Sequence, residues 1–266
     1  MYDRFNRHIN YLRISITDRC NLRCKYCMPA EGIELMHHDD ILSFEEIVEV
    51  VKTGVNNGIT KVRLTGGEPL VRKGIVDLVR MIAEVEGIED LAMTTNGTLL
   101  EQFAQQLKDV GLKRVNISLD TLDPEKYADL TRGGSVESVF RGIEAAQKAS
   151  FDPIKINCVI MKTSDEPDAL AVKKFAEENG LSVRFIHQMN LHTGEFSKVE
   201  GGEGGDCKSC NRIRLTANGG FKPCLFNDNC FNIKEYGAAE AMTKAIDAKP
   251  KAGSKNLSGK FYNIGG

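Results

Sequence analysis

Residues 11–29 of the chain read YLRISITDRCNLRCKYCMP and join a short apolar run to a cluster of cysteines. The run, residues 11–17, is rich in Leu, Ile and Thr and too short for a helix, which is typical of a buried strand. Cys20, Cys24 and Cys27 follow it directly. Because reactive groups of parallel α/β proteins lie in the loops after the strands, this stretch predicts a first strand that ends in a functional loop.

The alternation of strand and helix continues over the first 190 residues. Short apolar runs occupy residues 11–17, 61–67, 90–97, 114–120, 154–162 and 182–189, and helical patterns occupy residues 44–57, 73–86, 99–110, 135–149 and 167–179. Ser43 and Glu46 form a capping box at the start of the first helix. This order predicts right-handed βαβ units and a parallel sheet. Six units are fewer than the eight of a complete barrel, so we expect an α/β fold, a partial (β/α)6 TIM-like barrel, over residues 1–190.

The alternation stops near Met189. Residues 190–206 are polar and Gly-rich, which is typical of a loop. A cysteine-bearing region follows at residues 207–233, then a predicted helix at about 236–248 and a tail that ends in Gly265 and Gly266. We therefore expect residues 191–266 to form a small second region that carries the remaining cysteine group.

Composition narrows the class of protein. The formal net charge of −2 offers no basic field for nucleic acid or a membrane surface. No apolar run approaches the roughly 20 residues of a membrane span, and the first residues lack the apolar core of a signal peptide, so we expect a cytoplasmic protein. Thiols stay reduced in that compartment, and the eight cysteines are therefore interpreted as metal ligands before disulfides. Cys158 stands alone in an apolar run and is interpreted as a buried small residue.

The first cysteine group has the spacing C-x3-C-x2-C. Three thiolates on one loop can bind three irons of a [4Fe–4S] cubane and leave the fourth iron open for chemistry. Zinc is the alternative, but it usually needs a fourth ligand, and the nearest histidines, His37 and His38, lie ten residues farther on.

This motif, with Tyr26 before its last cysteine, resembles the signature of the radical S-adenosylmethionine (SAM) superfamily. Residues 66–69, GGEP, resemble the motif of that superfamily that contacts the amino group of the cofactor. The resemblance implies an iron–sulfur cluster on Cys20, Cys24 and Cys27, and S-adenosylmethionine cleaved to a radical. It also implies that the cofactor is bound by residues at six matching positions: Tyr26, Gly66, Gly67, Glu68, Ser118 and Met189.

The second cysteine group comprises Cys207, Cys210 and Cys224. Three thiolates again suggest a cluster with one open iron, whereas Cys230 could complete a four-cysteine zinc site or close the cluster. Arg212 and Arg214 follow Cys210 and alternate as residues on one face of a strand do.

Residues 210–226, CNRIRLTANGGFKPCLF, resemble the GTP 3′,8-cyclase family of molybdenum-cofactor biosynthesis. The resemblance implies a lyase with two [4Fe–4S] clusters that converts GTP into 3′,8-cyclo-7,8-dihydro-GTP, with guanine on the open iron of the second cluster. The substrate-binding positions that match are Arg13, Arg63, Thr94, Lys155, Arg184, Arg212, Ile213 and Arg214, and Gly265 and Gly266 match a double glycine that enters the active site. The partners that the family implies are an external electron donor and the downstream cyclic pyranopterin monophosphate synthase, and a homodimer is allowed.

Elementary chemistry is consistent with that set. The sequence has no G-x4-G-K-[S/T] phosphate loop, so side-chain cations would have to hold a triphosphate, and arginine forks suit that task. The chain also departs from the family pattern. Only eighteen positions separate Met189 from Cys207, where the family has several tens more, and His187 stands where a carboxylate is common.

Two other interpretations stay open. If Cys230 binds the second cluster, the chain is a radical SAM enzyme with a closed auxiliary cluster that acts on a peptide or another small molecule. The third alternative is an iron–sulfur or zinc protein without enzymatic activity, which would have no use for the GGEP segment.

Overall fold

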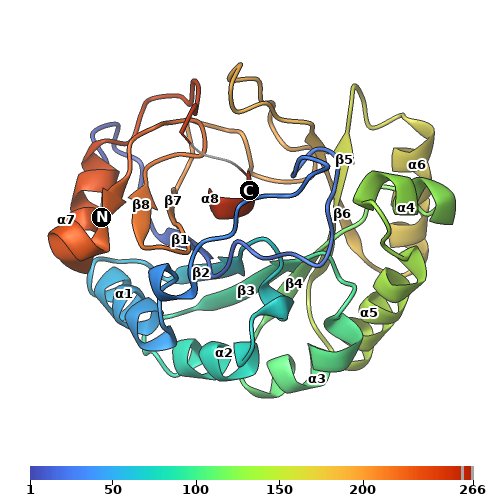
Figure 1. The fold of residues 1–266 in the computed structure, drawn as a ribbon, viewed down its shortest axis with the longest axis horizontal. Helices are drawn as coiled ribbons and strands as arrows, with labels where there is room; N and C mark the ends of the chain where they lie inside the picture. The colour runs from blue at the N-terminus through green and yellow to red at the C-terminus, as the bar shows by residue number, and fades with distance from the viewer. Residues whose placement is uncertain (259–260, 265–266) are drawn as a thin grey trace.

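The computed structural model describes residues 1–258 and 261–264. Within them, nine strands form one sheet in the order β6-β5-β4-β3-β2-β1-β7-β8-β9 (Figure 1). The strands are β1 (Tyr11–Ser15), β2 (Lys61–Thr65), β3 (Asp90–Thr95), β4 (Arg114–Ser118), β5 (Ile154–Ile160), β6 (Ser182–His187), β7 (Arg212–Leu215), β8 (Gly220–Lys222) and β9 (Phe231–Asn232). The strands β1 to β6 are parallel neighbours in chain order, which confirms the predicted partial barrel.

Helices cover the outer side of this curved sheet, as Figure 1 shows for α1, α2, α3, α5 and α6. The helices are α1 (Phe44–Asn56), α2 (Ile75–Ala83), α3 (Leu100–Asp109), α4 (Pro124–Thr131), α5 (Val136–Lys148), α6 (Pro167–Glu178), α7 (Ile233–Asp247) and α8 (Phe261–Ile264), with short 3-10 turns at His38–Asp40 and Pro69–Val71. The predicted helices are all present, although α2 is shorter than the predicted range 73–86. None of the helices in the described part of the chain is long and apolar enough to cross a membrane.

Helix α4 was not predicted, although its ends carry recognisable signals. The Asp123 side chain accepts from the backbone N–H groups of Glu125 and Lys126, and Pro124 occupies the first helical position. The helix ends where Arg132 adopts a left-handed conformation with φ of 55°. The helix is only eight residues long, so it shows too few turns for a clear apolar period.

Each barrel strand divides its side chains between two environments. On β1, Leu12 and Ile14 are fully buried in the core between sheet and helices. Tyr11 and Arg13 alternate with them and line the concave side of the barrel. This period of two brings one polar side chain after another to the inner side of the sheet.

The second region extends the barrel sheet. Strand β7 pairs in parallel with β1, with Tyr11 opposite Arg212 and Arg13 opposite Arg214. Strands β8 and β9 then add antiparallel pairs. As a result, two segments about 200 positions apart in the chain contribute side chains to one surface.

Candidate active site

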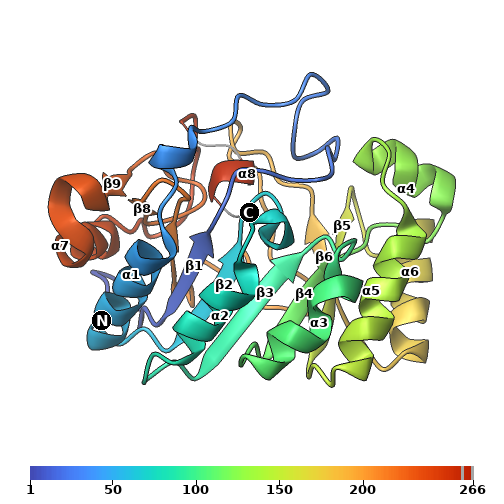
Figure 2. The same cartoon turned by 60° about the horizontal axis from the view of Figure 1, so that its bottom comes forward.

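The first cysteine group belongs to the loop after β1, and this loop lies above the carboxyl ends of the barrel strands (Figure 2). The Leu22 N–H donates to Cys20 Sγ at 3.4 Å, and the Cys27 and Met28 N–H groups donate to the Cys24 carbonyl at 2.9 and 3.0 Å. Burial and the neighbouring thiols raise the pKa of Cys24 and Cys27 to about 12. Free thiolates are therefore disfavoured here, and cationic iron would relieve this cost because it binds thiolate.

The donor set of the loop fits an iron–sulfur cluster. Cys20, Cys24 and Cys27 lie on one loop as free cysteines, and three such thiols can bind three irons of a [4Fe–4S] cubane. Across residues 1–258 and 261–264, no group of three His, Cys, Asp or Glu side chains is close enough to hold a single metal ion.

The GGE segment packs directly against the start of the cysteine loop. The Gly67 N–H donates to the Thr17 carbonyl and the Glu68 N–H to the Arg19 carbonyl, both at 2.8 Å. A Cβ on Gly67 would lie 2.3 Å from the Arg19 carbonyl oxygen, and one on Gly66 would lie 2.7 Å from that of Thr17. The two glycines are needed because any side chain would push the cysteine loop away from β2.

The Glu68 carboxylate is turned into the protein. It is 1% exposed and accepts from the Leu70 N–H at 3.0 Å, the Thr95 hydroxyl at 2.7 Å and the Asn96 N–H at 2.7 Å. Burial raises its pKa to about 7, although these hydrogen bonds act in the opposite direction. In this structure Glu68 therefore ties the loop after β2 to the end of β3.

Tyr26 connects the cysteine loop to the end of β4. Its hydroxyl donates to Asp120 Oδ2 at 2.8 Å, and the Val159 N–H donates to Asp120 Oδ1 at 2.7 Å. Burial raises the pKa of Asp120 to about 6, and both hydrogen bonds lower it. Asp120 was not predicted as a site residue, although an acid at the carboxyl end of a strand is the signal that marks it.

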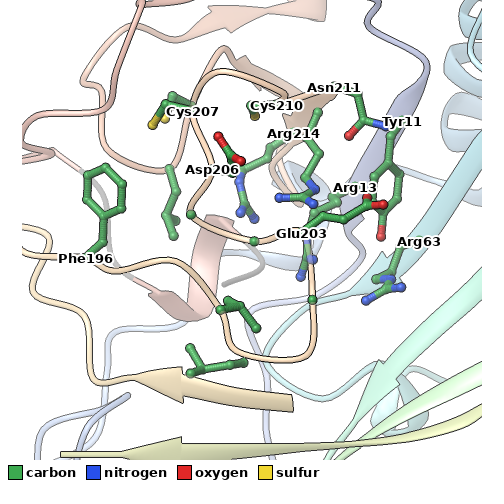
Figure 3. A pocket seen from close by; sticks show the side chains of 18 of the residues that line it. Tyr11, Arg13, Arg63, Phe196, Glu203, Asp206, Cys207, Cys210, Asn211 and Arg214 are labelled. Carbon is green, nitrogen blue, oxygen red and sulfur yellow. The ribbon is translucent and has the colours of Figure 1, made fainter. Parts of the chain in front are cut away.

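A pocket opens on the concave side of the barrel, and Figure 3 shows it from close by. Its lining includes many inward residues of the strands, a loop between β6 and β7, and all three cysteines of the second group. The strand residues are Tyr11, Arg13, Lys61, Arg63, Arg114, Asn116, Asn157, Arg184, Ile186, Arg212 and Arg214. The cysteines Cys207 and Cys210 lie above Arg214 in the view of Figure 3, and Cys224 also lines the pocket.

The arginines of this pocket are crowded. Burial, followed by the charge of Arg214, lowers the pKa of Arg13 well below its usual value. Burial also lowers the pKa of Arg63 and of Arg214. With its amide oxygen facing the arginines, Asn116 accepts from Arg63 at 2.9 Å and from Arg184 at 3.3 Å. So many cations in one partly buried site create a strong attraction for a polyanion.

Tyr11 separates two of these cations. The guanidinium carbons of Arg63 and Arg212 lie 5.6 and 5.7 Å from its ring centroid, at cation–π distance. Sequence reasoning did not identify Tyr11, Arg114, Asn116 or Asn157. The signal was present in β4, where Arg114 and Asn116 share the face of the predicted Ser118 at the period of two.

The predicted substrate residues do not all reach the lining. Arg13, Arg63, Arg184, Arg212 and Arg214 line the pocket, as does the predicted cofactor residue Met189. Lys155 and Thr94 are not part of the lining, although burial and then Arg184 lower the pKa of Lys155.

Four further predicted residues remain to be considered. The Ile213 side chain is fully buried in the core, opposite in direction to its two arginine neighbours. Ser118 is half-buried at the end of β4. Gly265 and Gly266 lie outside the described residues.

Cys230 is separated from the other cysteines of the second region. It is exposed and is not among the residues that line the pocket. Its Sγ packs over Gly220, 2.4 Å from where a Cβ on that glycine would lie. Burial raises the pKa of Cys230, and the charge of Lys222 acts in the opposite direction. The three pocket cysteines thus form a group without Cys230.

The loop between β6 and β7 closes one side of the pocket. Residues 202–206, with Phe196 and Val199, belong to the lining. Phe196 stacks on Phe226 with ring centroids 4.5 Å apart, which anchors the loop to the segment after Cys224. Gly201 and Gly205 have φ of +72° and +77°, which residues with a Cβ rarely adopt. The short connection therefore forms a pocket wall and places the acid Glu203 next to the arginines (Figure 3).

Comparisons with known proteins agree with this geometry. The family model of the radical SAM superfamily matches residues 14–176. A protein of Thermodesulfovibrio yellowstonii named GTP 3′,8-cyclase is 41% identical over an alignment of 310 positions, which covers 96% of this chain and 96% of the relative. A protein of Moorella thermoacetica with the same name is 42% identical over 297 residues, covering 94% of this chain and 92% of the relative.

Solved structures support the fold. The structure titled native anSMEcpe with bound AdoMet aligns with a TM-score of 0.62 and 18% identity over 91% of this chain and 81% of that chain. The structure of Streptococcus suis SuiB bound to S-adenosylmethionine aligns with a TM-score of 0.56 and 19% identity over 69% of this chain and 42% of that chain. The family match, the long alignments and the cysteine loop above the barrel agree. The chain is therefore an enzyme of the radical SAM superfamily, which joins an iron–sulfur cluster to S-adenosylmethionine, and within it a member of the GTP 3′,8-cyclase family.

Proposed function

We propose that the chain converts GTP into 3′,8-cyclo-7,8-dihydro-GTP for molybdenum-cofactor biosynthesis. One observation carries the proposal: the cysteines of the second group and five predicted arginines line one pocket. A triphosphate supplies the polyanion that such arginines attract, and guanine supplies nitrogen and oxygen atoms that can bind an open iron. The relatives that align over nearly the whole chain carry the name of this activity.

We assign the first cluster to Cys20, Cys24 and Cys27. When bound there with S-adenosylmethionine, it supplies the 5′-deoxyadenosyl radical that removes the hydrogen atom from ribose C3′ of GTP. Gly66 and Gly67 allow the loop after β2 to pack directly against the start of the cysteine loop, and Tyr26 fixes the cysteine loop through Asp120. We also propose that Ser118 and Met189 contact the bound cofactor.

The arginines then have a positioning role. Bidentate guanidinium groups hold phosphate oxygens in a fixed direction, which sets where ribose C3′ lies relative to the radical. We assign this role to Arg13, Arg63, Arg184, Arg212 and Arg214, with Lys155, Thr94 and the backbone of Ile213 as outer contacts. The C3′ radical attacks guanine C8, and one electron and one proton complete the 7,8-dihydro product.

We assign a second [4Fe–4S] cluster to Cys207, Cys210 and Cys224. Because Cys230 lies outside the pocket lining, three thiolates leave one iron for guanine. A closed cluster, and with it a peptide-modifying enzyme, has no comparable support.

Further parts of the proposal rest on family membership. Residues 1–190 would form the radical SAM barrel and residues 191–266 the auxiliary-cluster region, with Gly265 and Gly266 completing the active site. An external donor would supply electrons, and cyclic pyranopterin monophosphate synthase would take the product; a homodimer is compatible with this proposal.

The test uses reconstituted enzyme and GTP that carries deuterium at C3′. Hydrogen abstraction from that carbon places the deuterium in 5′-deoxyadenosine, which mass spectrometry detects. GTP deuterated only at C4′ is the matched control and should give unlabelled 5′-deoxyadenosine. If deuterium arrives from C4′ and not from C3′, the proposed reaction is wrong.

A further inference from the structure

Lys249 follows α7 and is almost completely buried, with 2% of its surface exposed. Its Nζ donates to Cys210 Sγ at 3.4 Å, to the Arg212 carbonyl at 2.6 Å and to the Pro223 carbonyl at 2.9 Å. An ammonium group has three N–H donors, so all of them are used. One side chain thus joins the segment of Cys210 to the segment that precedes Cys224.

The surroundings of this ammonium are unusual for a buried charge. Buried lysines are normally paired with carboxylates, because an uncompensated charge is costly in the protein interior. Among residues 1–258 and 261–264, Lys249 forms no ion pair with a carboxylate, and its contacts are two carbonyl oxygens and a cysteine sulfur. The cysteine sulfur is the only one of these three atoms that belongs to the proposed set of cluster ligands. The geometry therefore places the ammonium group directly beside a proposed ligand of the second cluster.

Arg7 links the residues directly after Lys249 to the segment of Cys207. The carbonyls of Pro250 and Lys251 accept from Arg7 at 2.7 and 3.2 Å, and the same guanidinium donates to the Cys207 carbonyl at 2.7 Å. Arg7 is itself held by Asp3 at 2.6 Å. The segment is thus fastened to Cys207 through a buried residue near the start of the chain.

Close packing completes the arrangement at Cys224. A Cβ on Gly253 would lie 3.4 Å from Cys224 Sγ and 2.8 Å from Cβ of Phe226. The Ser254 N–H donates to the Phe226 carbonyl at 3.0 Å. Residues 249–254, which we call the cysteine strap, therefore contact the segments of Cys210 and Cys224 directly and are linked to the segment of Cys207 through Arg7.

We propose that Lys249 is a positioning residue for the second iron–sulfur cluster, and that its charge sets the reduction potential of that cluster. The inference rests on the proposed second cluster but not on the identity of the substrate. A cation beside a ligand sulfur offsets the negative charge that the cluster gains on reduction, so reduction becomes easier. The fixed ammonium also sets the distance between the Cys210 and Cys224 segments, and hence where the open iron faces the arginines.

The test compares K249M, K249R and K251M in the reconstituted full-length enzyme without GTP. Methionine keeps the length of the side chain and removes the charge, whereas arginine keeps the charge. Lys251 is exposed on the same strap and provides a matched control, since K251M removes an equal charge while its backbone carbonyl still accepts from Arg7. The readouts are bound iron, the electron paramagnetic resonance spectrum of the second cluster and its midpoint potential.

We expect K249M either to lose the second cluster, with iron falling from about eight to about four atoms per chain, or to keep it with a lower midpoint potential and an altered spectrum. Cofactor cleavage at the first cluster should persist in K249M, and K249R and K251M should keep the second cluster. An unchanged spectrum and potential in K249M would overturn the proposal, as would equal shifts in K249R and K249M. Loss of both clusters in K249M would show that Lys249 supports the whole fold, which also overturns it. Because no arm contains GTP, a different substrate would leave these outcomes unchanged.

Discussion

Arg13 of β1 and Arg214 of β7 are register partners on adjacent parallel strands, and both side chains line the same pocket. Burial, followed by the charge of Arg214, lowers the pKa of Arg13, so each cation raises the cost of the other. A bound polyphosphate would reverse this effect, because its negative charge stabilises both guanidinium groups. The register of β1 and β7 thus places two guanidinium groups side by side in the pocket, where both can bind the anionic part of the substrate.

Arg214→Ala should weaken GTP binding by roughly tenfold or more, because a charge-assisted hydrogen bond contributes about 1.5–3 kcal/mol. Isothermal titration calorimetry measures the affinity. Lys208→Ala, an exposed cation next to Cys207, is the control and should bind GTP normally. Unchanged affinity in Arg214→Ala would leave the nucleotide site without its main support.

Glu203→Gln should strengthen GTP binding by roughly threefold, an effect typical of one partly solvated charge pair. The Glu203 carboxylate lines the cationic pocket and competes with phosphate for the arginines. Glu195→Gln makes the same charge change on an exposed residue of the same loop and should have no effect. The gain should shrink at high salt. Weaker binding in Glu203→Gln would show that the carboxylate contacts the substrate favourably.

Replacing Cys20, Cys24 and Cys27 together by Ala should remove one cluster and abolish the formation of 5′-deoxyadenosine. The second cluster should remain, because its three cysteines lie in another part of the structure. Iron analysis and chromatography of the products measure the two effects. Cofactor cleavage by the triple variant would contradict the assignment of the first cluster.

Cys230→Ser should keep both clusters, and GTP should still perturb the magnetic spectrum of the second one. The reason is geometric, since Cys230 packs over Gly220 and does not line the pocket. Cys224→Ser is the comparison and should lose the second cluster. A GTP effect seen only in Cys230→Ser, and not in the native protein, would mean that Cys230 closes the native cluster.

Glu68 should make the apoprotein less stable as the pH rises from about 5 to 7. Burial raises its pKa from 4.5 to about 7, so in this range the folded state binds more protons than the unfolded state. Stability is then greatest below the unfolded pKa and declines through the folded one, by at most about 3 kcal/mol. Urea denaturation of the native protein and of Glu68→Gln at pH 5 and pH 7 measures the slope, which should be flatter in the variant. Equal slopes would show that Glu68 is ionised in the fold.

Local patterns in the sequence determined the strands, most of the helices and the two cysteine groups. The apolar runs predicted β1 to β6 because a buried parallel strand leaves a short run of apolar residues. The capping box at Ser43 marked the start of α1 correctly. The spacing of Cys20, Cys24 and Cys27 indicated iron–sulfur chemistry because ligands on one loop are close in the chain as well as in space.

Only the tertiary structure decided which distant residues meet. Nothing local to Arg214 shows that β7 pairs with β1 and not with another strand, because register depends on the path of the whole chain. For the same reason Lys249 could not be linked to Cys210 from the sequence, although they are in contact in the fold. The inward direction of Glu68 was equally hidden, since it depends on hydrogen bonds with the end of β3. Short-range periodicity determines which elements form, whereas the pairing of strands determines which side chains share a pocket.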